Sequence, residues 1–242
     1  MTVILLRHGR STSNTAHTLA GRTDGVDLDD KGREQAQAVV ERLAGLPIRA
    51  IVRSPLLRCR RTVDPLAAAL GLDPVVDERI SEVDYGSWTG CKIGDLVNEP
   101  LWAVVQQQPS AAVFPGGEGL AHVQSRAVAA VREHDRRLSE LHDGDALWVA
   151  CTHGDVIKAV VADALGTHLD SFQRITADPA SMSVIRYTAL RPFVIHVNHT
   201  GAALTAGLLA KPPTADAQPD GQADNKDGEV PPEDAVVGGS TD

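Results

Sequence analysis

The chain has 242 residues, enough for one large domain or two small ones, and 43% of them are apolar although only 3% are aromatic. The formal net charge of −9 argues against nucleic acid as the main partner. No apolar run reaches the roughly 18 residues of a membrane span, and the N-terminus shows no signal-peptide pattern. Cys59, Cys91 and Cys151 lack metal-ligand spacing and indicate reduced thiols, so we expect a cytoplasmic protein without a membrane partner.

The first third of the chain predicts alternating strands and helices. Residues 3–6 form an unbroken apolar run, which predicts a strand buried on both faces. Apolar residues at helical spacing predict a helix over 31–46, and a second strand is expected over 48–53. Ser54 and Pro55 are typical of a helix cap and a first helical position, so the next helix is expected to begin there and end near residue 70.

The rest of the chain continues the alternation. Gly, Pro and Asp clusters divide it into short segments, and the apolar spacing within each segment favours either a helix or a strand. The expected elements are a strand at 75–76, an irregular stretch over 78–90, a helix over 93–107, a turn at 114–118, a helix with an apolar face through 141, a turn at 142–145, a strand over 146–150, a helix over 155–165, and an antiparallel hairpin of 182–187 with 193–198.

This order of elements predicts an α/β fold, a three-layer sandwich with a mostly parallel central sheet and an antiparallel hairpin at its edge. One domain is expected over residues 1–205. Residues 211–242 hold two lysines against six Asp and two Glu, contain no aromatic residue and show no apolar periodicity. Because such a composition cannot bury a core, we expect a disordered acidic tail over 206–242.

Chemistry-bearing side chains follow three of the predicted strands. Each of these strands ends at a cation or an imidazole, and a helix follows. The three places are Arg7-His8-Gly9, Ser54-Pro-Leu-Leu-Arg58 and Thr152-His153-Gly154. Ligands of open α/β sheets bind beyond the carboxyl ends of the strands, where helix N-termini favour anions. Since arginine can bond two phosphate oxygens at once, the sequence predicts a pocket for a compact phosphate dianion.

These residue types suit phosphoryl transfer. A neutral His8 can be the nucleophile if its other ring nitrogen is held as a donor, for instance by a backbone carbonyl. Arg7, Arg58 and His153 would carry the charge of the phosphoryl group, so no metal and no cofactor are expected. The sequence also has no Asp/Glu cluster that resembles a magnesium or zinc site.

Glu82 is the expected proton donor to the leaving group. Its neighbours Val83, Tyr85 and Trp88 are apolar or aromatic, and we expect them to withdraw the carboxyl from water. Desolvation raises the pKa of a carboxyl, which keeps a proton available near neutral pH.

The opening motif, Arg7-His8-Gly9-x-Ser-x-x-Asn14, resembles the signature of the histidine phosphatase superfamily in its phosphoglycerate mutase-like branch. The resemblance extends over about residues 2 to 200. The other matching segments are Gly21-Arg22-Thr-Asp followed by Leu28-x-x-Lys-Gly32, Ser54-Pro-Leu-x-Arg58-x-x-x-Thr62, Glu82-x-x-x-Gly86-x-Trp-x-Gly90, Gly116-Gly-Glu118 and Thr152-His153-Gly154.

The resemblance implies that His8 is phosphorylated transiently while Arg7, Arg58 and His153 hold the phosphoryl group. It places Asn14 and Arg22 at the edge of the site. Gly21, in the segment that resembles the substrate loop, and Gly154, beside the second histidine, complete the expected substrate-binding set.

Three functions compete at this stage. The first is a metal-independent phosphomonoesterase that acts on a small phosphorylated metabolite, the second a phosphoglycerate mutase, and the third a non-catalytic protein that binds a phosphorylated ligand. A non-catalytic protein is disfavoured because the chain keeps all the residues expected to perform catalysis, namely Arg7, His8, Arg58, Glu82 and His153. Arg22 stands where mutases resemble one another in having Trp, and the stretch from 90 to 115 is shorter than the mutases' basic insertion, which favours the phosphatase. A homodimer is an open alternative, since relatives are often dimers.

Overall fold

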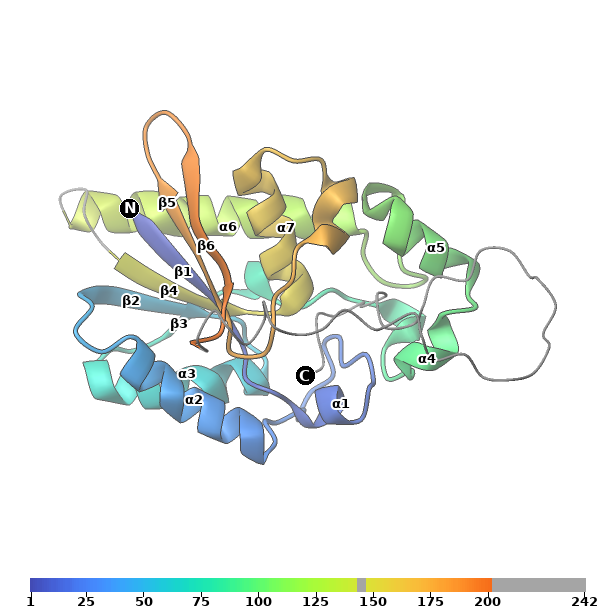
Figure 1. Cartoon of the computed structure of the whole chain (residues 1–242), viewed down its shortest axis with the longest axis horizontal. Coiled ribbons are helices and arrows are strands. Elements are labelled where there is room, and N and C mark those ends of the chain that lie inside the picture. The colour runs from blue at the N-terminus through green and yellow to red at the C-terminus, as the bar shows by residue number, and fades with distance from the viewer. Residues whose placement is uncertain (143–146, 202–242) are drawn as a thin grey trace, which may run out of the picture.

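The computed structural model describes residues 1–142 and 147–201, and Figure 1 shows them arranged around one central sheet. Within the described residues the sheet has six strands in the spatial order β3-β2-β4-β1-β5-β6. Strands β1, β2, β3 and β4 run parallel, whereas β5 is antiparallel to β1 and to β6. The strands are β1 (Thr2–Arg7), β2 (Ile48–Arg53), β3 (Val75–Val76), β4 (Leu147–Thr152), β5 (Met182–Tyr187) and β6 (Pro192–His199).

Strand β1 lies in the middle of the sheet and is buried on both faces, as its apolar run predicts. Successive side chains of a strand point to opposite faces. Val3 and Leu5 join the core under one helix layer, while Ile4 and Leu6 join the core under the other. Each of the four is at most 3% exposed, so β1 is fixed against both layers and its C-terminal end is held firmly.

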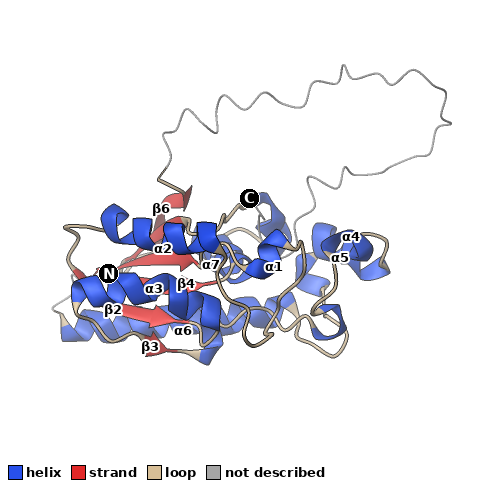
Figure 2. Ribbon diagram, turned by 90° about the horizontal axis from the view of Figure 1, so that it is seen from below, coloured by secondary structure: helices blue, strands red, loops and turns tan. Residues whose placement is uncertain are grey.

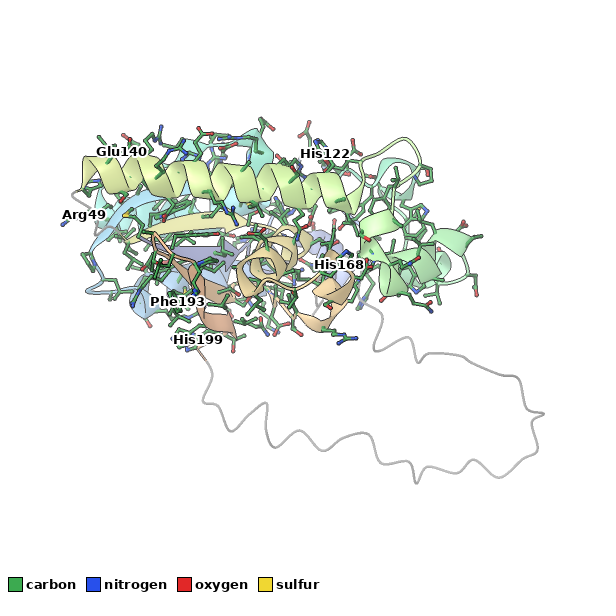
Figure 3. All side chains as sticks on the ribbon, turned by 90° about the horizontal axis from the view of Figure 1, so that it is seen from above. Arg49, His122, Glu140, His168, Phe193 and His199 are labelled. Carbon is green, nitrogen blue, oxygen red and sulfur yellow. The ribbon has the colours of Figure 1, made fainter. Side chains whose placement is uncertain are left out.

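Helices cover both faces of the sheet, which confirms the predicted three-layer α/β sandwich. Figures 1 and 2 show α2 (Asp30–Arg42) and α3 (Leu57–Leu70) on one face. On the other face lie α6 (Leu120–Leu141) and α7 (Gly154–Leu165). In Figure 3 the long helix α6 runs along its face, with His122 near its start and Glu140 near its end.

Shorter elements gather beyond the carboxyl ends of the parallel strands (Figure 1). They include the helices α1 (Thr12–Thr15), α4 (Ile93–Leu96) and α5 (Pro100–Gln107). The described chain also has short 3₁₀ turns, which are η1 (Glu78–Ile80), η2 (Gly86–Trp88), η3 (Pro109–Ala111) and η4 (Leu169–Arg174).

Three predicted helix boundaries are wrong. The helix expected over 31–46 ends at Arg42, because the chain turns at Gly45 with a φ of 77°. The helix expected to begin at Ser54 begins at Leu57, and its N-terminus has no side-chain cap. The helix expected over 93–107 is interrupted before Pro100, whose missing N–H is tolerated where α5 begins.

Helix α1 was not predicted. Ser11 and Asn14 form a capping box there, in which each side chain binds the other's backbone N–H. The strand expected over 146–150 extends to Thr152. The turn at 142–145 and the acidic tail at 206–242 fall almost entirely on residues outside the described ranges. In the described part of the chain, no helix is long and apolar enough to cross a bilayer.

Candidate active site

Strand β1 ends at Arg7 and delivers His8 into the interior, where the histidine is only 3% exposed. The His8 backbone N–H donates to the Thr152 carbonyl oxygen at the end of β4, at 3.0 Å. Its ring nitrogen Nδ1 lies 2.7 Å from the carbonyl oxygen of Gly9. Because a carbonyl only accepts, Nδ1 carries the hydrogen, and the lone pair of the neutral ring is on Nε2.

The surroundings of His8 oppose its protonation. Burial lowers its pKa well below the usual value, and the nearby guanidinium groups of Arg58 and Arg7 lower it further. The hydrogen bond to the Gly9 carbonyl works in the opposite direction but does not outweigh them. The ring is therefore neutral at physiological pH and keeps its nucleophilic lone pair.

Arg58, in the first turn of α3, connects the parts of the site. Its Nε donates to His8 Nε2 at 3.2 Å, and its Nη2 lies 2.8 Å from the Gly21 carbonyl oxygen and 3.2 Å from His153 Nδ1. Its Nη1 is buried and has no hydrogen-bond partner among the described residues. Since Arg58 also lines the pocket beside His8, this donor is suited to an oxygen of a bound anion.

His153 is the N-cap residue of α7 and is fully buried. Its ring centre lies 5.2 Å from that of His8, at an angle of 62°. Since Arg58 can only donate, His153 Nδ1 accepts, and the hydrogen on Nε2 points to the Ser54 hydroxyl oxygen 2.8 Å away. Burial, together with Arg58, lowers the pKa of His153 well below its usual value, so this ring is neutral too.

Arg7, the last residue of β1, is held by a backbone carbonyl from another part of the chain. Its Nη1 donates to the Ala177 carbonyl oxygen at 2.7 Å, in the segment that leads into β5. Burial lowers the pKa of the guanidinium, but the neighbouring carboxyl groups of Glu82, Asp178 and Asp155 oppose that shift. Arg7 and Arg58 thus place two cationic side chains around the His8 ring.

Glu82 follows η1 and is only 4% exposed. Its Oε1 accepts the Val83 backbone N–H at 2.9 Å, and its Oε2 lies 3.8 Å from His153 Nδ1. Burial, followed by the charge of Asp155, raises the pKa of Glu82 to about 7, although Arg58, Arg7 and the Val83 N–H work against the shift. The direction is the one that the sequence predicts, and the carboxyl holds a proton near neutral pH.

One pocket opens over these groups. It brings together six of the residues singled out from the sequence, namely Arg7, His8, Asn14, Gly21, Arg58 and Glu82. The wall also contains Tyr85, which the sequence predicts beside Glu82, and Ser11 of the opening motif. Its other members are Ser13, Thr18, Leu19, Ala20 and Ile93, to which the sequence analysis assigns no role. Ser13 lies inside the opening motif and could be found there, whereas nothing in the sequence distinguishes Thr18 or Ile93.

Asn14 and Gly21 form part of the pocket rim. Asn14 Oδ1 accepts from the backbone N–H of Ser11 at 3.0 Å and from its hydroxyl at 2.8 Å, so any hydrogen bond from Asn14 to a ligand comes from Nδ2. Gly21 has a φ of 49°, a conformation that favours glycine, and this turns its carbonyl toward Arg58.

Arg22, His153 and Gly154 do not line the pocket. His153 lies beneath Arg58, and Gly154 is buried as the first residue of α7. Arg22 forms an ion pair with Glu118 at 2.7 Å, and its Nε donates to the Glu82 backbone carbonyl at 2.9 Å. In this arrangement Arg22 supports the segment that carries Glu82 instead of reaching into the pocket.

Several other histidines lie on the outside or serve the core. His122, His168 and His199 are exposed, and Figure 3 labels all three. His134 is buried in α6, where its Nε2 lies 2.8 Å from Asp77 Oδ2.

Comparisons with known proteins point to one family. Residues 3–200 match the family model of the histidine phosphatase superfamily, branch 1. Phosphoserine phosphatase 1 of Hydrogenobacter thermophilus is 29% identical over 203 residues, which cover 82% of this chain and 92% of the relative. The probable phosphoglycerate mutase GpmB of Salmonella choleraesuis is 31% identical over 188 residues, which cover 76% and 84% of the two chains.

A solved structure shows the same likeness in three dimensions. The mycobacterial glucosyl-3-phosphoglycerate phosphatase, determined with VO3, superimposes with a TM-score of 0.74 at 26% identity, over 82% of this chain and 98% of that one. The chain therefore belongs to the histidine phosphatase superfamily, branch 1, and its phosphatase relatives class it as a phosphoric monoester hydrolase.

Proposed function

We propose that this enzyme is a metal-independent phosphomonoesterase that hydrolyses a small phosphorylated metabolite through a phosphohistidine on His8. The observation that carries the proposal is the 2.7 Å hydrogen bond from His8 Nδ1 to the Gly9 carbonyl. It leaves the lone pair on Nε2, within 3.2 Å of the Arg58 guanidinium. A neutral imidazole with one nitrogen held as donor is a competent nucleophile.

In the first step, a phosphoryl group enters between Arg7 and Arg58, and the Arg58 Nε–H turns from His8 to a phosphoryl oxygen. His8 Nε2 forms a bond to phosphorus while the bond from phosphorus to the alcohol oxygen breaks. Glu82 gives its proton to that oxygen, so the alcohol leaves uncharged. The two guanidinium groups neutralise charge on the phosphoryl oxygens throughout.

In the second step, water replaces the alcohol. The Glu82 carboxylate takes a proton from the water, whose oxygen bonds to phosphorus as the bond to nitrogen breaks. The electron pair returns to His8 Nε2, and inorganic phosphate leaves. A carboxyl that holds a proton near neutral pH can act as acid in one step and as base in the next, and a pKa of about 7 for Glu82 suits both.

The alternative is a mutase, which returns the phosphoryl group to another hydroxyl of the substrate. Arg22 and the short stretch over 90–115, which holds the short helices α4 and α5 and the 3₁₀ turn η3, favour hydrolysis. The test is to incubate the enzyme with 3-phosphoglycerate, phosphoserine, glucosyl-3-phosphoglycerate and sugar phosphates and to measure inorganic phosphate and isomer together. Phosphate release without isomerisation is expected. Isomer in excess of phosphate would establish the mutase, and binding without any product would establish a phospho-ligand-binding protein.

Hydrolysis of p-nitrophenyl phosphate is expected to survive exhaustive treatment with EDTA. The reason is that Arg7 and Arg58, both buried beside His8, supply the positive charge that a metal ion would otherwise supply. The measurement is the steady-state rate before and after chelation, with vanadate inhibition as the control for activity at the phosphate site. Loss of activity that magnesium or zinc restores would contradict the metal-free mechanism.

A further inference from the structure

A buried carboxylate with no assigned role lies behind the pocket. Asp155, the second residue of α7, is 2% exposed. Its Oδ2 accepts the Tyr85 hydroxyl hydrogen at 2.7 Å, and its Oδ1 lies 3.6 Å from Lys158 Nζ. Neither Asp155 nor Lys158 belongs to the phosphate-binding or nucleophilic groups, so the mechanism above does not use them.

Asp155 and Lys158 are both buried, and Lys158 has further contacts around its amino group. Lys158 Nζ donates to Gln173 Oε1 at 2.6 Å and lies 4.1 Å from the centre of the Phe172 ring. Lys158 is 3% exposed. Taking two charges out of water is costly, and an apolar pair of similar volume is often as stable. A buried ion pair next to an active site therefore calls for a role other than stability.

Tyr85 connects this pair to the pocket. Its ring lies edge-on to Phe114, with centres 5.0 Å apart and an angle of 89°. Both Tyr85 and Glu82 line the pocket, so the carboxylate that fixes the Tyr85 hydroxyl stands directly behind the wall that contains the proton donor.

Glu82 is surrounded by charged and titratable groups from several elements. They are Arg7 from β1, Arg22 from the loop between α1 and α2, Arg58 from α3, Arg126 from α6, His153 at the N-cap of α7, Asp155 and Lys158 from α7, and Tyr85 from its own segment. The guanidinium groups of Arg7 and Arg58 favour an ionised Glu82, and Asp155 is the carboxylate that opposes them.

We propose that Asp155 is a positioning residue for the reaction: its buried negative charge keeps the proton on Glu82, and its hydrogen bond holds Tyr85 in the pocket wall. Lys158 lies beside Asp155 in the same buried cluster, with its Nζ 3.6 Å from Asp155 Oδ1. The proposal rests on the proposed function, because it assigns to Asp155 control of the proton that Glu82 gives to the leaving group.

The sign of the effect follows from the charges. If the negative charge of Asp155 is removed, the arginines dominate and the pKa of Glu82 falls. A smaller fraction of the enzyme then holds the proton at a given pH above that pKa. The alkaline limb of kcat/KM for a substrate that needs the acid therefore moves to lower pH, while a substrate that does not need the acid keeps its profile.

Asp155→Asn tests this, because asparagine keeps the shape and its amide oxygen can still accept from Tyr85. We expect the alkaline limb for an alkyl phosphate to move down by roughly one pH unit. At pH values above the limb, this shift lowers kcat/KM for the alkyl phosphate by about tenfold. The profile for p-nitrophenyl phosphate should not move. Asp163→Asn is the matched control on the same helix, where Asp163 pairs with Arg132 on the surface, and it should leave both profiles unchanged.

The outcomes separate this inference from the proposed function. The role of Asp155 would be overturned if Asp155→Asn left the alkaline limb of the alkyl phosphate profile in place, or if it lowered kcat/KM equally for both substrates. If wild-type enzyme shows no alkaline limb with the alkyl phosphate, or if Glu82→Gln does not discriminate between the two substrates, the acid role of Glu82 itself fails and the inference fails with it. Asp155→Glu restores the charge, and the limb should return toward its wild-type position.

Discussion

His8→Ala is expected to lower the turnover of every phosphomonoester by on the order of 10⁴-fold or more. The reason is that the described pocket offers no substitute nucleophile. Ser11 and Ser13 line it, but a hydroxyl without an adjacent base is weakly nucleophilic. Burial raises the pKa of the Cys151 thiol well above its usual value, so that residue has little thiolate to offer. The measurement is the steady-state rate with several substrates.

Binding of inorganic phosphate separates a chemical defect from a folding defect. The His8→Ala protein should still bind phosphate, with lower affinity, because Arg7 and Arg58 remain in the pocket. His168→Ala is the matched control, since this histidine is exposed at the start of η4 and should be replaceable without loss of activity. Substantial turnover by His8→Ala with its phosphate site intact would show that another group performs the attack.

Glu82→Gln is expected to slow hydrolysis of alkyl phosphates by about 10²- to 10⁴-fold, the usual cost of losing a general acid. Hydrolysis of p-nitrophenyl phosphate should be far less affected, because its leaving group departs as a stable anion. The amide also cannot titrate. The alkaline limb expected from the raised pKa of Glu82, about 7, should therefore disappear from kcat/KM in the variant.

Kinetics with both substrate classes, measured across the same pH range, check this prediction. The glutamine is close in size to the glutamate and can still accept the Val83 N–H through its amide oxygen, so the local backbone should keep its place. Equal losses on alkyl and aryl phosphates would mean that Glu82 contributes to binding or to the shape of the pocket instead of proton transfer.

Much of the fold could be predicted, because the central strands β1 and β4 are buried on both faces and appear in the sequence as apolar runs. Strand β2 matches its predicted range, and β1 and β4 differ only at their ends. The start of α3 was missed for a physical reason. A serine before a helix can cap it, but the Ser54 hydroxyl instead accepts a hydrogen bond from His153 Nε2 at 2.8 Å, and the helix begins later, at Leu57.

For the site, the sequence predicts which side chains the strand ends bring together, but not the contacts between distant parts of the chain. Arg7, His8 and Arg58 could be placed together from the sequence because each follows a strand of the same sheet. The ion pair of Arg22 could not be predicted, since its partner Glu118 lies 96 residues further along the chain. Asp155 and Lys158 occupy ordinary helical positions in the sequence, and only the packing of α7 reveals that both charges are buried.

The central claim is a covalent phosphohistidine on His8, and its most direct test is to trap that species. Enzyme mixed with a phosphorus-labelled substrate is quenched within milliseconds, and the label is located by peptide mapping. We expect label on the peptide that contains His8, labile in acid and stable in alkali as a phosphoramidate is, and absent in His8→Ala. An acid-stable phosphoserine, a label on another residue, or an adduct that persists in His8→Ala would contradict the account.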